Sequence, residues 1–407
     1  MSTTKTFTYK AKNVAGKTSK GKITARDQAE ASAILRKQGL NVLDVQERSG
    51  LGSLQIGTVK PGVKKGELEL FTRQLATMIS AGIPLLECLE VLHEQVESPG
   101  FKKTIHGLVT EIRGGSDFSA ALARYPKVYT RIYVSMVKAG EASGQLDDIL
   151  VRLAEYLEAT AKLKREIKSA MTYPIVSMIM VVGITAFLMV FIIPKFKEIF
   201  DNLGVELPGI TKFVMGISLW MEKNILVCLG GMVGFFLLFS FWRKSPAGQK
   251  VWDRVVLTVP VFGPLFRKVA LSRFSRTFST MIKSGVPILG SLEIVAETAG
   301  NSVISRAVEN AMESVRHGET LAAPLEKEKV FPPMVVRMIG IGERSGALEA
   351  LLSKISEFYD QQVEAEVKSL TSLIEPLLIG IMGFVVGGIV MSVFLPIFKL
   401  QEALTPK

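Results

Sequence analysis

Three long stretches of the chain carry no Asp, Glu, Lys or Arg. They cover 26, 19 and 23 residues and lie at positions 169–194, 224–242 and 376–398. Because about 20 apolar residues in a helix cross the hydrocarbon core of a bilayer, the pattern predicts three transmembrane helices. A fourth apolar run, residues 255–266, has only 12 residues and contains two prolines and a glycine. We interpret it as a turn or an interfacial segment.

Between residue 67 and the first crossing, apolar side chains recur with the period of a helix. From residue 67 to residue 170 the pattern is broken at four places that contain glycine or proline: 82–84, 98–100, 113–116 and 126. After Leu146, apolar side chains recur every three or four residues. The pattern predicts a bundle of short helices, of which the last leads into the membrane.

The same pattern occurs twice in the chain. Residues 71–95 match residues 274–298, at an offset of 203, in eleven of 25 positions without a gap. After a slip of one residue, 140–144 falls opposite 342–346, at an offset of 202. A repeat of this length indicates a repeated structural unit. Each unit is predicted to be a cytosolic helix bundle followed by a crossing.

Arginine, glycine and proline stand out among the shared residues. They are Arg73 and Arg276, Gly82 and Gly285, Pro84 and Pro287, and Pro174 and Pro376. We expect the glycine and proline at 82–84 and at 285–287 to end one helix and begin the next. The crossing at 224–242 has no counterpart, so it must return the chain to the side on which both units begin.

The first 48 residues form a separate part. They are expected to contain two strands and a helix, at 7–11, 21–25 and 27–38, with Asp27 as the helix N-cap. Residues 1–48 are therefore predicted to be a small α/β module. Residues 49–65 are rich in Gly, Ser and Lys and are predicted to be a linker.

Composition and charge place large parts of the chain in water and orient it. The mean hydropathy is +0.32, yet 21% of the residues are charged. Lysines and arginines crowd the approach to the first crossing at 162–168 and follow the second at 243–254. The positive-inside rule then puts the N-terminus and both bundles in the cytosol. The net charge of +11 is better explained by this orientation than by direct binding of nucleic acid.

No signal peptide is predicted, because the first thirty residues hold seven Lys or Arg and no apolar block. The predicted layout has a cytoplasmic bundle, a crossing, a periplasmic loop, a second crossing, a second cytoplasmic bundle, a third crossing and a periplasmic tail. Their bounds are 66–168, 169–194, 195–223, 224–242, 243–375, 376–398 and 399–407.

Motifs for catalysis, metal binding or cofactor binding are near misses. Residues 11–18 approach a phosphate-binding loop, but Ala11 replaces its first glycine. Residues 93–97 approach a zinc motif, but Glu97 replaces the second histidine. Cys88 and Cys228 are expected in different media, so no disulfide is predicted. We expect no catalytic residue, no metal site and no cofactor.

The repeated G-E-x-S-G segment is the most specific motif. Its members are Gly140, Glu141, Ser143 and Gly144 in the first copy and Gly342, Glu343, Ser345 and Gly346 in the second. One interpretation is a turn in which the first glycine ends a helix and the serine caps the next. The other is that the glutamate holds a buried arginine or meets a partner. Glu375, at the edge of the third crossing, is either a boundary residue or a polar contact for a partner.

These segments resemble those of a known family, the inner-membrane platform proteins of type IV pilus and type II secretion machines (PilC and GspF). The resemblance covers nearly the whole chain, including both G-E-x-S-G segments and the two prolines Pro174 and Pro376. It implies an all-α membrane protein with two homologous cytoplasmic six-helix bundles, three transmembrane helices and a small N-terminal α/β module. Tyr173 stands where the second copy has Glu375, so the two copies differ at this point.

The resemblance also implies a role and partners. The role is a hub in the bacterial inner membrane, on which pilin subunits are added to the base of a filament. The implied partners are a hexameric assembly ATPase, with a retraction ATPase as a further candidate, pilin or pseudopilin subunits, inner-membrane alignment proteins, membrane lipid and further copies of the chain.

Two alternatives remain beside a pilus platform. The first is the equivalent platform of a type II secretion system. The second is a transporter or channel subunit, which the absence of ionisable residues from the crossings disfavours. An enzyme would need a catalytic grouping that the local sequence does not suggest.

Overall fold

The computed structural model describes residues 5–12, 18–25, 27–37, 41–47, 62–64, 66–196 and 209–404. The chain divides into two compact units, Met1–Pro61 and Gly62–Lys407. Most of the segment expected to be a linker, and most of the near-match to a phosphate-binding loop at 13–17, lie outside the described residues.

The first unit contains three strands and one helix: β1 (Lys5–Lys12), β2 (Thr18–Ala25), α1 (Gln28–Lys37) and β3 (Asn41–Glu47). The strands form an antiparallel sheet in the order β2-β1-β3. A side-chain oxygen of Asp27 accepts a hydrogen bond from Glu30 N at 2.7 Å, so Asp27 caps α1 as predicted. Ala31 and Leu35 of α1 are buried. The third strand, β3, was not among the elements expected.

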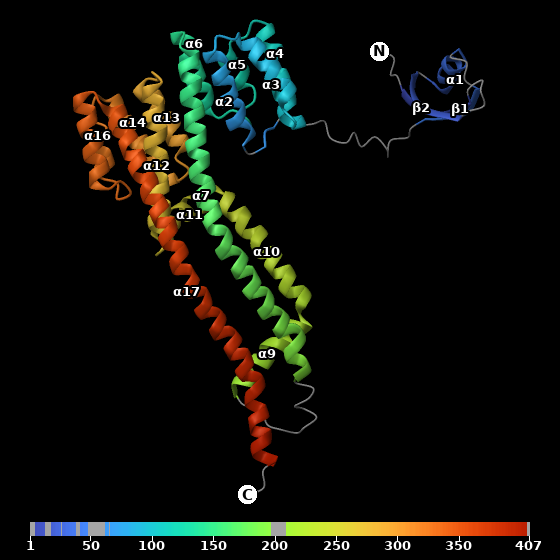
Figure 1. Ribbon diagram of the computed structural model, residues 1–407, viewed down its shortest axis with the longest axis vertical. Helices are drawn as coiled ribbons and strands as arrows, with labels where there is room; N and C mark the ends of the chain where they lie inside the picture. The colour runs from blue at the N-terminus through green and yellow to red at the C-terminus, as the bar shows by residue number, and fades with distance from the viewer. Residues whose placement is uncertain are drawn as a thin grey trace. The chain divides into compact units, whose positions relative to one another are not determined.

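The second unit begins with a helical bundle, which we call bundle 1 (Figure 1). Its helices are α2 (Glu67–Ser80), α3 (Leu85–Gln95), α4 (Pro99–Arg113), α5 (Phe118–Ala123), α6 (Arg131–Ser143) and the first part of α7 (Leu146–Phe187). All six helices contribute side chains to one core, in which Phe71, Phe101 and Phe118 are among the largest buried residues. The apolar positions spaced by three and four residues thus face inward.

Bundle 2 repeats this arrangement. Its helices are α12 (Phe262–Lys283), α13 (Ile288–Thr298), α14 (Ser302–Arg316), α15 (Ala322–Glu326), α16 (Pro333–Ser345) and the first part of α17 (Leu348–Leu404). A further helix, α11 (Pro246–Thr258), adds Leu257 to the core. The six helices that the resemblance implies are therefore joined by a seventh in the second copy.

The glycine and proline pairs shape the same turn in both bundles. Gly82 and Gly285 have φ of 84° and 77°, a conformation that glycine adopts without the clash a side chain would make. Pro84 and Pro287 directly precede α3 and α13. This agrees with the helix breaks expected at these positions.

The membrane-crossing segments continue the last helix of each bundle. After Phe187, α7 passes through a π-helical turn, η1 (Leu188–Ile192), and the described part of the helix extends to Phe196. α17 runs without a break for 57 residues. Pro174 and Pro376 therefore lie inside long helices, as is tolerated in membrane helices where neighbouring groups satisfy the freed carbonyls.

Within the described residues, three helices are long and apolar enough to cross a membrane: Leu146–Phe196, α10 (Ile225–Lys244) and Leu348–Ser392. The pair α11 and α12, bent by 109°, would make a fourth if it were one span. Because both helices contribute to the core of bundle 2, we assign the pair to the bundle. The bend lies within the 255–266 segment interpreted as a turn.

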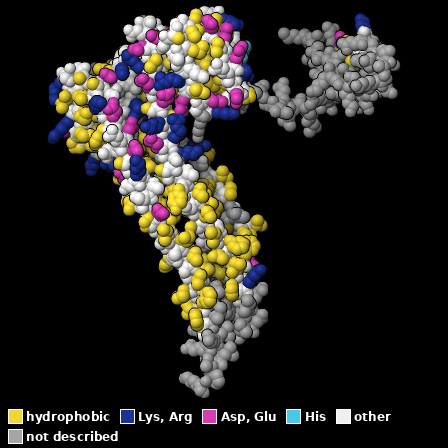
Figure 2. Space-filling view, viewed as in Figure 1, with side chains coloured by type: hydrophobic (Ala, Val, Ile, Leu, Met, Phe, Trp, Pro, Cys, Tyr) yellow, Lys and Arg dark blue, Asp and Glu magenta, His cyan; other side chains and the backbone are white. Residues whose placement is uncertain are grey.

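The segment expected to be a periplasmic loop contains a helix. Residues 209–223 form α9 (Gly209–Lys223), which packs against η1 and α17. Thr211 Oγ1 donates to the backbone oxygen of Ser392 at 3.0 Å, and Met215 forms an apolar cluster with Ile193 and Ile389. Figure 2 shows hydrophobic side chains covering the long helices and charged side chains gathered on the bundles.

Candidate functional site

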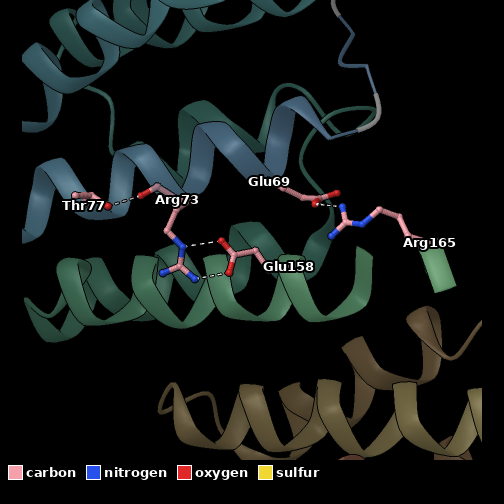
Figure 3. Close-up of polar contacts among 5 residues, drawn as sticks. All are labelled: Glu69, Arg73, Thr77, Glu158 and Arg165. Atoms are coloured by element: carbon pink, nitrogen blue, oxygen red, sulfur yellow. Dashed lines mark hydrogen bonds and ion pairs between the residues drawn. The ribbon is translucent and has the colours of Figure 1, made fainter. Parts of the chain in front are cut away.

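Arg73 joins the first and last helices of bundle 1 (Figure 3). Its guanidinium donates through Nε and Nη2 to the two carboxylate oxygens of Glu158, each at 2.6 Å. Nearby, Arg165 on α7 reaches Glu69 on α2 at 3.0 Å. The hydrogen bond to Glu158 raises the pKa of Arg73. Because a bidentate pair fixes orientation as well as distance, these contacts set α2 against α7.

Arg276 makes the equivalent contact in bundle 2 at greater depth. Its Nη2 donates to Oδ2 of Asp360, and the hydroxyl of Ser272 donates to Oδ1. The side chain of Arg276 is 19% exposed, compared with 36% for Arg73. Burial lowers the pKa of Arg276, but a guanidinium group stays charged in proteins. The pair therefore replaces lost hydration of both ions.

The two acids, Glu158 and Asp360, were not singled out from the sequence. They are separated by 202 residues, the offset of the G-E-x-S-G segments, whereas the arginines are separated by 203. Extending the repeat alignment past the turn pairs the acids. A count of identities hides the match, since one copy has Glu and the other Asp.

The repeated glutamates cap a short helix. The carboxylate of Glu141 accepts from Phe118 N at 2.5 Å and from Ser119 N at 3.1 Å, at the start of α5. Glu343 Oε1 accepts from Leu321 N at 2.7 Å, at the start of α15. A carboxylate is favoured at a helix N-terminus, where backbone N–H groups are unpaired. The hydrogen bonds of both glutamates among the described residues are therefore to backbone N–H groups and not to an arginine, and contact with a partner stays a prediction.

The first glycine of each motif lets two helices approach closely. A Cβ on Gly140 would lie 3.1 Å from Ile149 Cβ, and a Cβ on Gly342 would lie 2.9 Å from Leu348 Cα. The expectation that this glycine ends a helix is wrong, because Gly140 and Gly342 lie inside α6 and α16. Their role is to set the crossing of α6 on α7 and of α16 on α17.

The serine and the last glycine end the helix. Ser143 and Ser345 are the last residues of α6 and α16, and Gly144 and Gly346 follow with φ of 70°. This is the left-handed C-cap that glycine favours. The expectation that the serines cap the next helix is wrong, since their hydroxyls donate back to carbonyls of their own helix, at 3.4 and 2.8 Å.

Bundle 1 contacts bundle 2 through α6 and α7 on one side and α12, α13 and α17 on the other, a contact that we call the seam. Arg131 on α6 donates to Glu293 at 3.2 Å and to Glu297, both on α13. Farther along, the hydroxyl oxygen of Tyr156 on α7 lies 3.3 Å from the hydroxyl oxygen of Thr277 on α12. Met281 and Ile294 of bundle 2 belong to the core of bundle 1. The seam is therefore both polar and apolar.

A cavity of about 510 Å³ opens on the seam. The first copy of the G-E-x-S-G motif contributes Ala142 and Ser143 to its wall, and the turn of the second copy contributes Gly285 and Pro287. Charges of both signs, including Lys138, also line it. The cavity is large enough for a side chain or loop of a binding partner, and it is where the repeated motifs of the two copies meet.

A second cavity, of about 350 Å³, lies between α7 and α12 where the first uncharged run begins. Lys164, Lys168 and Arg273 give it a basic side, and Ile167 and Met171 give it an apolar side. Basic groups at the cytosolic edge of a membrane favour anionic headgroups.

Glu375 lies on the exposed surface of α17, between the exposed side chains of Leu373 and Leu377. It makes no ion pair with any described residue. Tyr173, its counterpart on α7, is also exposed. Both interpretations of Glu375, a boundary residue and a polar contact for a partner, stay predictions.

The described residues contain no group of three or more His, Cys, Asp or Glu that could hold a metal ion. The rings of His93 and His106 lie 5.5 Å apart, and burial lowers the pKa of His93. Cys88 and Cys228 are free thiols.

Comparison with known proteins also finds two repeats in the chain. A family model described as "Type II secretion system (T2SS), protein F" matches residues 71–194 and again residues 274–396. A second, described as the N-terminal domain of type II secretion system protein F, matches residues 1–46. The two matched segments coincide with the repeats.

Curated relatives match over nearly the whole chain. The chain is 43% identical to the type IV pilus assembly protein PilC of Myxococcus xanthus, over 98% of this chain and 95% of the relative. It is 42% identical to the protein of that name from Thermus thermophilus, over 98% and 99%. It is 34% identical to the type II secretion system protein F of Vibrio cholerae, over 98% and 99%. With two matched repeats and relatives of this length and identity, the chain belongs to the type II secretion system protein F family.

Proposed function

We propose that this chain is the inner-membrane platform of a type IV pilus assembly machine. In this role it is a mechanical adaptor without enzymatic activity, and it transmits the work of a hexameric cytoplasmic ATPase to pilin subunits at the base of the filament. The N-terminus and both bundles lie in the cytosol. Alignment proteins of the inner membrane, a retraction ATPase and further copies of the chain are the other proposed partners.

The observation that carries the proposal is the ranking of the relatives. Identity is 42–43% to proteins named for type IV pilus assembly and 34% to a type II secretion protein of comparable coverage. The alternative, a platform for type II secretion, uses the same architecture. The secretion alternative has less support only because the identity to the secretion protein is lower.

Three features of the second unit support a mechanical role. The bundles are held together by the polar and apolar contacts of the seam. Arginine–carboxylate pairs fix the first helix of each bundle to its last. These last helices, α7 and α17, continue into the uncharged runs without a break. A displacement of either bundle would therefore move a crossing directly.

The basic cavity between α7 and α12 supports contact with lipid. Lys164, Lys168 and Arg273 line it at the edge of the bilayer, where they would attract anionic headgroups. No site for nucleic acid is proposed, because orientation in the membrane accounts for the positive charge.

Complementation tests the proposal. A bacterial strain that lacks this chain is expected to lose surface filaments and to regain them when the gene is restored, with secretion through a type II system unchanged. Loss and recovery of secretion, with filaments unaffected, would favour the alternative. Loss of neither would reject both platforms.

A further inference from the structure

The seam joins unlike faces of two like bundles. Bundle 1 uses α6 and α7, with Arg131, Arg152 and Tyr156. Bundle 2 uses α12 and α13, with Thr277 and Glu293. Where they approach the uncharged runs, the last helices α7 and α17 also pack on each other. Because the bundles are repeats, each also has the face that the other uses. One face of each kind is therefore left outside the seam.

The open face of bundle 2 lies on α16 and α17. At the offset of 202, the seam residues Ser135, Ala139, Ala142, Arg152 and Tyr156 correspond to Arg337, Ile341, Arg344, Lys354 and Phe358. All five residues of bundle 2 are exposed, Ile341 by 51% and Phe358 by 41%. This face therefore combines cations with large apolar side chains that nothing covers within the described residues.

The open face of bundle 1 lies on α3. At the offset of 203, Gly290, Glu293, Ile294 and Glu297 correspond to Glu87, Glu90, Val91 and Glu94. Val91 is exposed, although its counterpart Ile294 is buried in the seam. Glu90 pairs with Arg113, whereas Glu87 and Glu94 make no ion pair with a described residue. This face is acidic around an apolar centre.

The two open faces are complementary in charge. Arg337 and Arg344 make no ion pair with any described residue, and they would meet the unpaired Glu87 and Glu94. The second copy has Pro333 in place of Arg131, and Lys354 is held by Glu357 at 2.8 Å. Arg337 and Arg344 would thus replace Arg131 in the equivalent contact.

The direction of the membrane helices permits the contact to repeat. In Figure 1, α7 and α17 leave the bundles toward the same end, α16 lies on the side of bundle 2 away from bundle 1, and α3 lies on the opposite side of bundle 1. A second copy placed in the same membrane can therefore offer its α16 to the α3 of the first. Contacts between unlike faces close into rings or extend into open chains.

We infer that the α16–α17 face of one copy docks on the α3 face of a second copy, in a head-to-tail repetition of the seam. The proposed function includes association with further copies of the chain. The inference names the surfaces that make this association, and it rests on this part of the proposed function alone. Association of the purified protein tests the inference without a measurement of filaments. If the copies do not associate through these faces, the assignment to a pilus machine is unaffected, because complementation tests it separately.

The test uses two full-length charge-reversed variants with different affinity tags. The first is Arg337→Glu with Arg344→Glu, and the second is Glu87→Lys with Glu94→Lys. When a variant is coexpressed with a differently tagged copy of itself, affinity purification of one copy is expected to recover at least about tenfold less of the other copy than for the unmodified chain. When the two variants are coexpressed, the acidic α16 face of one meets the basic α3 face of the other, and association returns.

Controls keep the result interpretable. Arg306→Glu with Glu309→Lys changes exposed charges on α14 and should leave association unchanged. Equal membrane abundance and thermal midpoint show that the variants fold. The inference is overturned if either variant still associates with itself as the unmodified chain does. It is also overturned if the folded variants fail to associate with each other.

Discussion

The two arginine–carboxylate pairs show one contact at two depths. Arg73 and Glu158 are partly in solvent, where water screens the pair and its contribution is small. Arg276 and Asp360 are more deeply buried, and Ser272 adds a hydrogen bond. Removing one partner there leaves a poorly hydrated charge, which costs more than the pair contributes.

The first prediction compares these acids. Asp360→Asn should lower the free energy of unfolding by about 2 kcal/mol, less than for a fully buried pair because both side chains keep some contact with water. Glu158→Gln should lower it by at most about 1 kcal/mol. Denaturant unfolding of the protein in detergent measures both. Equal losses would mean that burial does not distinguish the pairs.

A second prediction concerns the glutamate caps. Glu141→Ala should lower stability by about 1 kcal/mol, the usual effect of losing an N-cap, and should speed hydrogen exchange at the amides of Phe118 and Ser119. Glu141→Gln should have a smaller effect, because its amide oxygen can still accept one bond. Loss of filaments in Glu141→Gln at normal membrane abundance would instead indicate a contact with a partner.

At the scale of the elements, the helix patterns, the repeat and the three crossings could be predicted from the sequence. Apolar spacing and runs without charge depend on burial and on lipid, and both leave a local record. Long-range partners leave no such record. The sequence therefore gave no reason to pair Arg73 with Glu158, or Glu141 with the start of α5.

The third prediction tests the helix crossing at the glycine motif. Gly342→Ala would place a Cβ 2.9 Å from Leu348 Cα, and the forced shift of α16 from α17 should cost about 2 kcal/mol. Gly290→Ala is the matched control, because its nearest neighbour, Val286 Cγ1, would be 3.7 Å away. It should stabilise α13 by about 0.5–1 kcal/mol. A neutral Gly342→Ala would show that α16 and α17 can separate without cost.

At the scale of the whole molecule, α9 was a feature that the sequence patterns did not predict, whereas they did predict that the last helix of the bundle leads into the membrane. α9 has charged residues near its ends, Lys212 and Lys223, so it resembles a polar loop in a count of charges. The structure shows that this segment is a helix, which packs on η1 and α17. The third crossing was predicted to begin at Pro376, but α17 passes through this residue.

A fourth prediction concerns orientation in the membrane. A reporter enzyme active only outside the cytosol should be active when fused after Asp201 or at the C-terminus, and silent when fused after Pro246. The reason is the excess of Lys and Arg beside the second bundle and before the first crossing. Activity of the fusion after Pro246 would overturn the arrangement of two outward crossings and one return.

The seam is the feature on which mechanical coupling of the two bundles most depends. Arg131→Glu would place a carboxylate beside Glu293 and Glu297, and like charges this close repel. Restoring opposite charge with Glu293→Arg and Glu297→Arg in the same chain would allow the contact to form again. Both variants keep the cores and the crossings unchanged.

Filament output of a strain complemented with these two variants, measured beside their abundance in the membrane, tests the coupling most directly. We predict that Arg131→Glu inserts normally but yields at most about a tenth of the filaments, and that the triple variant restores them. Normal output from Arg131→Glu would contradict the account, because the bundles would then work without being held at the seam.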